Sequence, residues 1–97
     1  ASPATTLAER RCLSSKAEQA DKAMGVLVDS LRRSLSDSAG AALDTATRQW
    51  SAYRKAECDA LLKSYDGGSM GLIENLNCII ALTVERQRQL RLLYSTN

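Results

Sequence analysis

The chain has 97 residues, a net charge of +2, 44% hydrophobic and 25% charged residues, which predicts one small folded domain over residues 1–97 and excludes a disordered chain. Its basic side chains are interspersed with acids, so nucleic-acid binding has little electrostatic support. It contains no histidine, which excludes Ser-His-Asp and Cys-His catalysis, and its three cysteines form no C-x-x-C pair. We therefore expect no metal and no cofactor.

The first predicted helix covers residues 6–35. Helix-forming residues dominate the chain and its single proline is Pro3, so helix is favoured throughout. Apolar residues recur three and four positions apart, as in one buried helical stripe, at Leu13, Ala17, Ala20, Met24, Leu27, Leu31 and Leu35. Gly25 lies within this helix and marks either a close helix contact or a tolerated glycine, of which we favour the second.

The second predicted helix covers residues 39–64. Three consecutive N-cap candidates, Ser36, Asp37 and Ser38, place a tight turn before it. Its apolar face is formed by Leu43, Ala46, Trp50, Tyr53 and Leu61. The helix should end at residues 64–69, because Gly67 and Gly68 tolerate the positive φ values of a C-cap, and Ser69 is suited to cap the next helix.

The third predicted helix covers residues 70–94, with a stripe formed by Leu72, Leu76, Ile79, Thr83, Arg86, Leu90 and Leu93. Short connections between long helices make neighbours antiparallel. The sequence therefore predicts an all-α, up-down-up three-helix bundle. Each helix should be on the order of 35 to 45 Å long, which makes the molecule a rod. No apolar stretch reaches the roughly 20 residues that cross a bilayer, so no transmembrane segment is expected.

Two cysteines flank the glycine turn at similar distances along the chain. Cys58 precedes it and Cys78 follows it, so an antiparallel hairpin places both at the same height and a disulfide between them is geometrically reasonable. The alternative is a pair of reduced, buried cysteines in a cytosolic protein. Cys12 then has no partner. It is a free thiol, half of an intermolecular bridge or a competitor for Cys58. We expect an unpaired cysteine without a catalytic role.

Trp50, Tyr53, Arg54, Glu57 and Arg86 form the most chemically suggestive group. Arg86 interrupts an apolar stripe, so we expect it either to extend to solvent or to meet an acceptor such as Glu57 or a backbone carbonyl. Trp50 is a candidate to lie against its guanidinium plane. We interpret the group as a structural polar anchor rather than a ligand site.

Three segments carry a resemblance to a known family. They read WSAYRKAEC, YDGGSM and, after a further cysteine, ALTVERQRQL. In order and spacing they resemble the family of secreted bacterial proteins that includes the N-terminal domain of LprI, a lysozyme-inhibiting lipoprotein. The residues that match are Trp50, Tyr53, Arg54, Cys58, Gly67, Gly68, Ser69, Cys78, Thr83, Arg86 and Leu90.

The resemblance implies an exported helical domain, periplasmic or secreted, and it supports the pairing of Cys58 with Cys78. We expect the opening Ala-Ser-Pro-Ala to be the start of a mature protein after removal of a signal peptide; the alternative is a chain trimmed at this point, which would look the same. Family members commonly carry a cysteine upstream of the position of Cys12, and residues 1–5 contain none. The resemblance therefore leaves Cys12 without its usual partner.

By analogy, the chain is expected to act as a lysozyme-inhibitor-like binding protein rather than an enzyme. The turn at residues 66–70 would occlude the glycan cleft, with contacts from Asp66, Ser69 and Met70. Its slightly basic charge disfavours the strongly basic animal lysozymes as partners. The alternative is an envelope interaction module that binds another periplasmic protein through a helical face. Catalysis is the weakest hypothesis, because Glu57 and Asp59 lack a visible complement.

Overall fold

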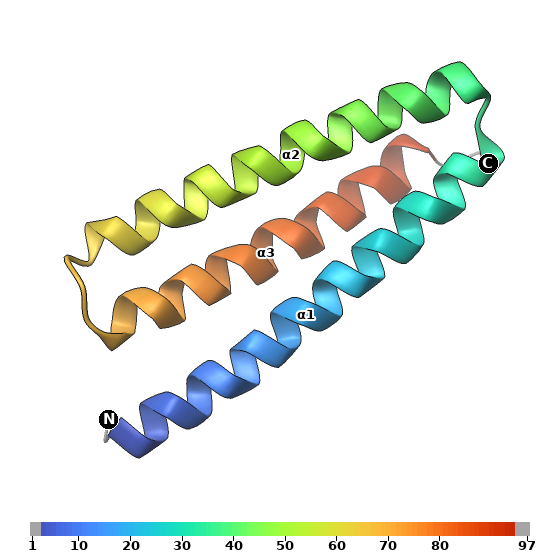
Figure 1. Ribbon diagram of the computed structural model, residues 1–97. Coiled ribbons are helices and arrows are strands. Elements are labelled where there is room, and N and C mark those ends of the chain that lie inside the picture. Colours follow the sequence, from blue (N-terminus) through green and yellow to red (C-terminus); the bar gives the residue numbers. More distant parts are fainter. Residues whose placement is uncertain (1–2, 95–97) are drawn as a thin grey trace.

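The computed structural model describes residues 3–94, which form three helices joined by two short connections (Figure 1). Helix α1 spans Pro3–Ser34, α2 spans Asp37–Ser64 and α3 spans Ser69–Leu93. No strand occurs in this described part of the chain. The predicted all-α fold is thus confirmed, and α1 begins earlier than the apolar pattern indicated.

Helix α3 occupies the centre of the bundle. It packs along its length against both α1 and α2, whereas α1 and α2 contact each other much less. Figure 1 shows α3 running between the two other helices, with the α2–α3 turn near the N-terminal end of α1. The overall dimensions are 51 × 21 × 18 Å, so the predicted rod is confirmed.

The connection between α1 and α2 is fixed by a cap and an ion pair. Ser36 is the N-cap of α2, and its hydroxyl oxygen accepts a hydrogen bond of 3.2 Å from the backbone N–H of Ala39, as one of the three N-cap candidates predicted. Close by, the Arg32 guanidinium lies 3.0 Å from the Asp44 carboxylate. The cap fixes the start of α2, and the ion pair joins α1 to α2 at this end of the rod.

The largest apolar cluster lies at the same end. Its buried members are Met24, Val28, Leu43 and Leu90, and Leu27, Leu31, Leu35, Trp50 and Tyr94 pack against them. Burying a leucine or methionine contributes roughly 1.5–3 kcal/mol, so this cluster is a main source of stability. Gly25 lies outside it, and a Cβ at this position would meet no atom within 4 Å, so this glycine marks no close helix contact.

Three apolar residues that were expected on buried faces are exposed. Leu72 and Leu93 of α3 are 40% and 71% exposed, and Tyr53 of α2 is 53% exposed. In α3 the contacts with both α1 and α2 set the buried surface, which is rotated from the predicted stripe. Ile73 and Gln87, which the stripe omitted, are accordingly buried.

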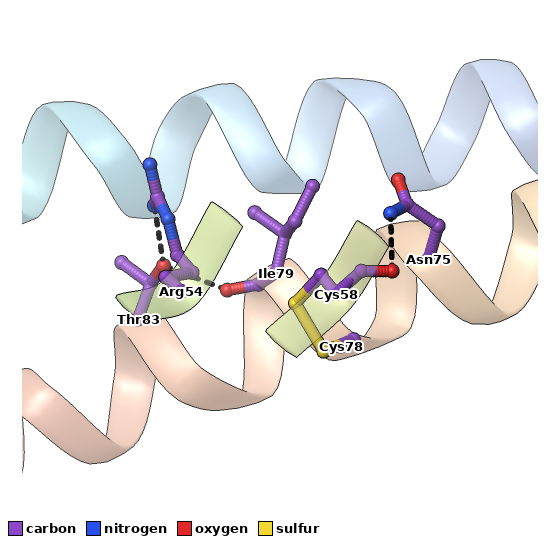
Figure 2. Close-up of a disulfide and its surroundings, with 6 residues drawn as sticks. All are labelled: Arg54, Cys58, Asn75, Cys78, Ile79 and Thr83. Carbon is purple, nitrogen blue, oxygen red and sulfur yellow. Dashed lines mark hydrogen bonds between the residues drawn. A yellow bond between two sulfur atoms is a disulfide. The ribbon is translucent and has the colours of Figure 1, made fainter. Parts of the chain in front are cut away.

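The predicted disulfide joins α2 to α3. Cys58 and Cys78 are bonded, with a Cα–Cα distance of 5.7 Å and a separation of 20 residues along the chain. Cys58 is buried, and its backbone carbonyl accepts a hydrogen bond of 2.9 Å from the Asn75 side-chain amide (Figure 2). The two helices are therefore tied covalently and by a polar contact at one level of the hairpin.

We expect the double substitution Cys58→Ala/Cys78→Ala to lower the free energy of unfolding by about 3 kcal/mol, because the disulfide restricts the unfolded chain by closing this loop. Urea unfolding of both proteins without reductant measures the difference. Cys12→Ser is the control and should leave stability unchanged, since Cys12 is exposed and outside the bridge. Equal stabilities of the double variant and the wild type would contradict a stabilising bridge.

Candidate functional site

The turn between α2 and α3 forms an exposed tip of the rod. The chain leaves α2 through Tyr65, whose N–H donates to the carbonyl of Leu62, and then takes three successive positive φ values at Asp66, Gly67 and Gly68. Two glycines and an aspartate suit these conformations, as the sequence predicted for the glycines. Every residue from 63 to 70 is exposed.

Ser69 does not cap α3, contrary to expectation. It is the first residue of the helix, and the N-cap position is taken by Gly68, which has no side chain to accept a hydrogen bond. The Ser69 side chain is exposed instead. Met70 follows it and is 54% exposed, so the three residues proposed for partner contacts, Asp66, Ser69 and Met70, all lie at the surface of the tip.

Gly71 positions this tip, and the sequence analysis missed it. It is buried, and a Cβ added to it would lie 3.0 Å from the Cβ of Tyr65 and 3.3 Å from a methyl carbon of Leu62. A larger residue at this position would therefore have to displace the end of α2 and its C-cap by a few tenths of an ångström. Its position shortly after the Gly-Gly turn was the feature of the sequence that could have indicated a close contact between the two helices.

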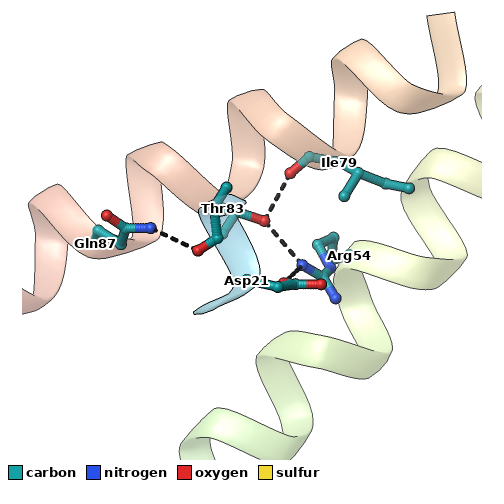
Figure 3. A network of polar contacts seen from close by, with 6 residues as sticks. Asp21, Arg54, Ile79, Thr83 and Gln87 are labelled. Carbon is teal, nitrogen blue, oxygen red and sulfur yellow. Dashed lines mark hydrogen bonds and ion pairs between the residues drawn. The ribbon is translucent and has the colours of Figure 1, made fainter. Parts of the chain in front are cut away.

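A polar network crosses the middle of the bundle and joins all three helices (Figure 3). The Arg54 guanidinium of α2 donates to the Asp21 carboxylate of α1 at 2.5 Å and to the Thr83 hydroxyl of α3 at 2.8 Å. Thr83 is fully buried and donates in turn to the carbonyl of Ile79 at 2.7 Å. Arg54 also lies over the Trp50 ring, 5.0 Å from its centroid.

Arg54, not Arg86, is therefore the guanidinium that Trp50 covers. Arg86 is half-buried, and no hydrogen bond or ion pair joins it to Glu57 in the described part of the chain; Glu57 is exposed. The reason is helical register. Thr83 and Gln87 face the interior of the bundle, so Arg86 lies at the edge of that surface.

Gln87 provides a second polar contact between α3 and α1, which the sequence analysis also missed. Its buried side-chain amide donates a hydrogen bond of 3.0 Å to the backbone carbonyl of Ala20 (Figure 3). No buried side-chain nitrogen or oxygen lacks a hydrogen-bond partner among the described residues. The interior polar groups of the described residues thus bond to one another within the bundle.

The remaining chemically active side chains are dispersed on the surface. Cys12 is exposed and outside the disulfide, and Asp59 forms an ion pair with Lys55 within α2. On α3, hydrogen bonds from the Arg88 guanidinium hold the pKa of the Glu85 carboxyl below its usual range. The described residues contain no group of ligands that could hold a metal ion, and none of their helices is long and apolar enough to cross a membrane.

We expect Gly71→Ala to lower the free energy of unfolding by about 1–3 kcal/mol, because the added methyl group would overpack the contact with Tyr65 and Leu62. The matched control is Gly25→Ala. There the methyl group enters open space within a helix, and alanine's higher helix propensity should raise stability by up to about 1 kcal/mol. Denaturant unfolding distinguishes the two signs, and a neutral Gly71→Ala would contradict the tight contact.

We expect Thr83→Val to cost about 1–3 kcal/mol of unfolding free energy, because it removes the buried hydroxyl that accepts from Arg54. Thr47→Val is the control. The Thr47 hydroxyl also donates to the carbonyl four residues earlier, at 2.8 Å, but contacts no guanidinium. Its loss should change stability by less than about 0.5 kcal/mol. Equal costs at the two threonines would show that the Arg54 contact contributes nothing.

Comparison with known proteins places the chain in a family. A family model described as "Lysozyme inhibitor LprI" matches residues 1–90 of the 97. No curated protein and no solved structure gives a significant match. The match spans all of α1 and α2 and most of α3, including the tip and both bridged cysteines. The chain therefore belongs to the lysozyme inhibitor LprI family.

Proposed function

We propose that this protein is an exported lysozyme-inhibitor-like binding protein that occludes the glycan cleft of its target with the α2–α3 tip, residues 65–70. The observation that carries the proposal is the family match over residues 1–90. The family is one of inhibitors, and inhibition requires binding rather than catalysis. This fits a chain without histidine, whose buried polar groups serve the scaffold.

The shape of the tip supports occlusion. A helical hairpin end is narrow and convex, and an enzyme's glycan cleft is concave, so the tip offers a complementary shape. Its exposed side chains combine an aromatic ring and a thioether, Tyr65 and Met70, with the carboxylate of Asp66 and the hydroxyl of Ser69. Apolar anchors surrounded by polar contacts are typical of protein interfaces.

The location of the charge removes an objection to basic lysozymes as targets. The net charge of +2 is not spread evenly along the rod. Residues 3–21, 54–66 and 69–80, which lie between the tip and the level of the Arg54–Asp21 ion pair, carry seven acidic and six basic side chains. The excess positive charge lies in the rest of the rod, which a tip-first complex keeps farther from the target, where salt screens it.

The rigidity of the hairpin also favours binding by the tip. The Cys58–Cys78 bridge and the close contact at Gly71 restrict α2 and α3 on the side of the tip. A binding element that is already ordered loses less conformational entropy when it enters a cleft. The turn therefore needs little rearrangement to act as a plug.

We expect the wild-type protein at micromolar excess to inhibit at least one lysozyme in a cell-wall lysis assay. Met70→Ala and Asp66→Asn should each raise the inhibition constant about tenfold or more, the effect of losing a central interface contact. Asparagine tolerates the positive φ at position 66, so Asp66→Asn tests the charge without straining the turn.

The controls keep exposure and chemistry matched but move the change away from the tip. Val84 is 54% exposed, like Met70, and Asp29 is an exposed acid on α1. Val84→Ala and Asp29→Asn should leave inhibition unchanged. If animal and bacterial lysozymes all retain full activity with the wild type, lysozyme inhibition is excluded. If the controls lose as much inhibition as the tip variants, the tip is not the binding element.

A further inference from the structure

Figure 1 shows α1 and α2 farther apart at the tip than at the other end of the rod, with α3 between them. At mid-bundle the two helices are linked through the ion pair between Arg54 and Asp21. Nearer the tip, a groove of about 320 Å³ lies between α1 and α3. It is lined by Leu7, Arg10, Arg11, Ser14, Leu72, Asn75 and Leu76. We call it the α1–α3 groove.

The lining of this groove is mainly apolar. Leu7 comes from the first turns of α1, and Leu72 and Leu76 come from the start of α3. Leu7 and Leu72 are each 40% exposed, although two leucines on facing helices would normally be covered. Water therefore contacts an apolar surface that a hydrocarbon chain could cover, with the gain in free energy that apolar burial brings.

The charged groups at the same groove are all positive, and its neutral polar groups include hydrogen-bond donors. Arg10 and Arg11 line the α1 side, together with the Ser14 hydroxyl, and the described residues that line the groove include no acidic side chain. The Asn75 amide is already engaged with the carbonyl of Cys58. Guanidinium groups pair with carboxylates through charge-assisted hydrogen bonds, so the groove favours a negatively charged head group.

We propose that the α1–α3 groove binds the monomer of a single-chain anionic amphiphile, with a fatty-acid carboxylate on Arg10 and Arg11 and its alkyl chain along Leu7, Leu72 and Leu76. Its volume lies at the lower end of the range for small-molecule sites, which fits one chain rather than a two-chain lipid. This site is separate from the residues proposed to contact lysozyme.

Another hollow of the molecule does not offer the same chemistry. It has a volume of about 510 Å³, lies between α2 and α3, and meets the α1–α3 groove at Asn75. Its charged residues include the Lys55–Asp59 ion pair and Arg54, whose guanidinium is paired with Asp21. Arg48 also lines this hollow, donates to the Thr45 hydroxyl and forms no ion pair among the described residues. The hollow contains the Asp59 carboxylate, whereas the described lining of the α1–α3 groove contains no acid, so the groove favours an anion more strongly.

The test uses the whole chain, labelled with ¹⁵N, and titrates it with monomeric decanoate while amide chemical shifts are recorded. The shifts should be concentrated at residues 7–14 and 72–76, and decyltrimethylammonium, of equal chain length and opposite charge, should bind at least tenfold more weakly. Across hexanoate, octanoate and decanoate, affinity should rise about fourfold per methylene, as expected for apolar burial.

Two pairs of variants locate the site. Leu72→Asp should weaken decanoate binding at least tenfold, whereas Val84→Asp, at a similarly exposed position of α3, should leave it unchanged. Arg10→Gln/Arg11→Gln should weaken binding about tenfold, and Arg33→Gln/Arg91→Gln, which removes the same charge at the other end of the rod, should not. Thermal unfolding of each variant shows whether the fold is retained.

The proposal is overturned if decanoate and decyltrimethylammonium bind equally, if affinity does not depend on chain length, or if shifts spread over the rod. It is also overturned if the protein binds anionic vesicles but no monomeric decanoate, because the surface would then recognise a bilayer. The result is independent of lysozyme inhibition, since the Met70→Ala variant should retain decanoate binding whether or not it inhibits.

Discussion

The tie between α2 and α3 is the constraint on which the other contacts depend. Three helices of this size bury a thin core, and here the largest apolar cluster lies at the end of the rod opposite the tip. Toward the tip, the Cys58–Cys78 disulfide also holds α2 against α3. With the hairpin fixed, α3 can present one face to α2 and another to α1, which explains its central place.

Polar groups inside the bundle then determine how α1 docks. Arg54 reaches from α2 across α3 to α1, and Gln87 donates to a backbone carbonyl of α1. Apolar contacts between helices tolerate sliding, whereas these hydrogen bonds are satisfied at one register only. The buried network therefore favours a unique alignment of α1 against the hairpin, and the α1–α3 groove lies beyond it, nearer the tip.

Sequence reasoning recovered the helices, their order and the bridge because these depend on local spacing. The Gly-Gly turn and the positions of Cys58 and Cys78 are properties of a single hairpin, and the Ser36 cap is local to one connection. The expected cap by Ser69 was wrong. The predictions were wrong for side chains whose burial or contacts depend on how all three helices pack together. The spacing predicted one buried stripe on α3, although this helix has two neighbours. Leu72 was therefore expected in the core, and Trp50 was a candidate to lie against Arg86. Gly71 was overlooked because its role is a close contact with the side chains of Leu62 and Tyr65 rather than a turn.

The stacking of Arg54 on Trp50 has an optical consequence. Trp50 is the only tryptophan, and the cation above its ring is the one that holds Asp21 of α1. The indole emission therefore reports on a single place in the molecule, the junction between the first helix and the hairpin. Detachment of α1 would free the guanidinium and change the environment of the ring even where the disulfide kept the hairpin intact. The chain thus contains an intrinsic fluorophore for the docking of one helix, separate from the folding of the other two.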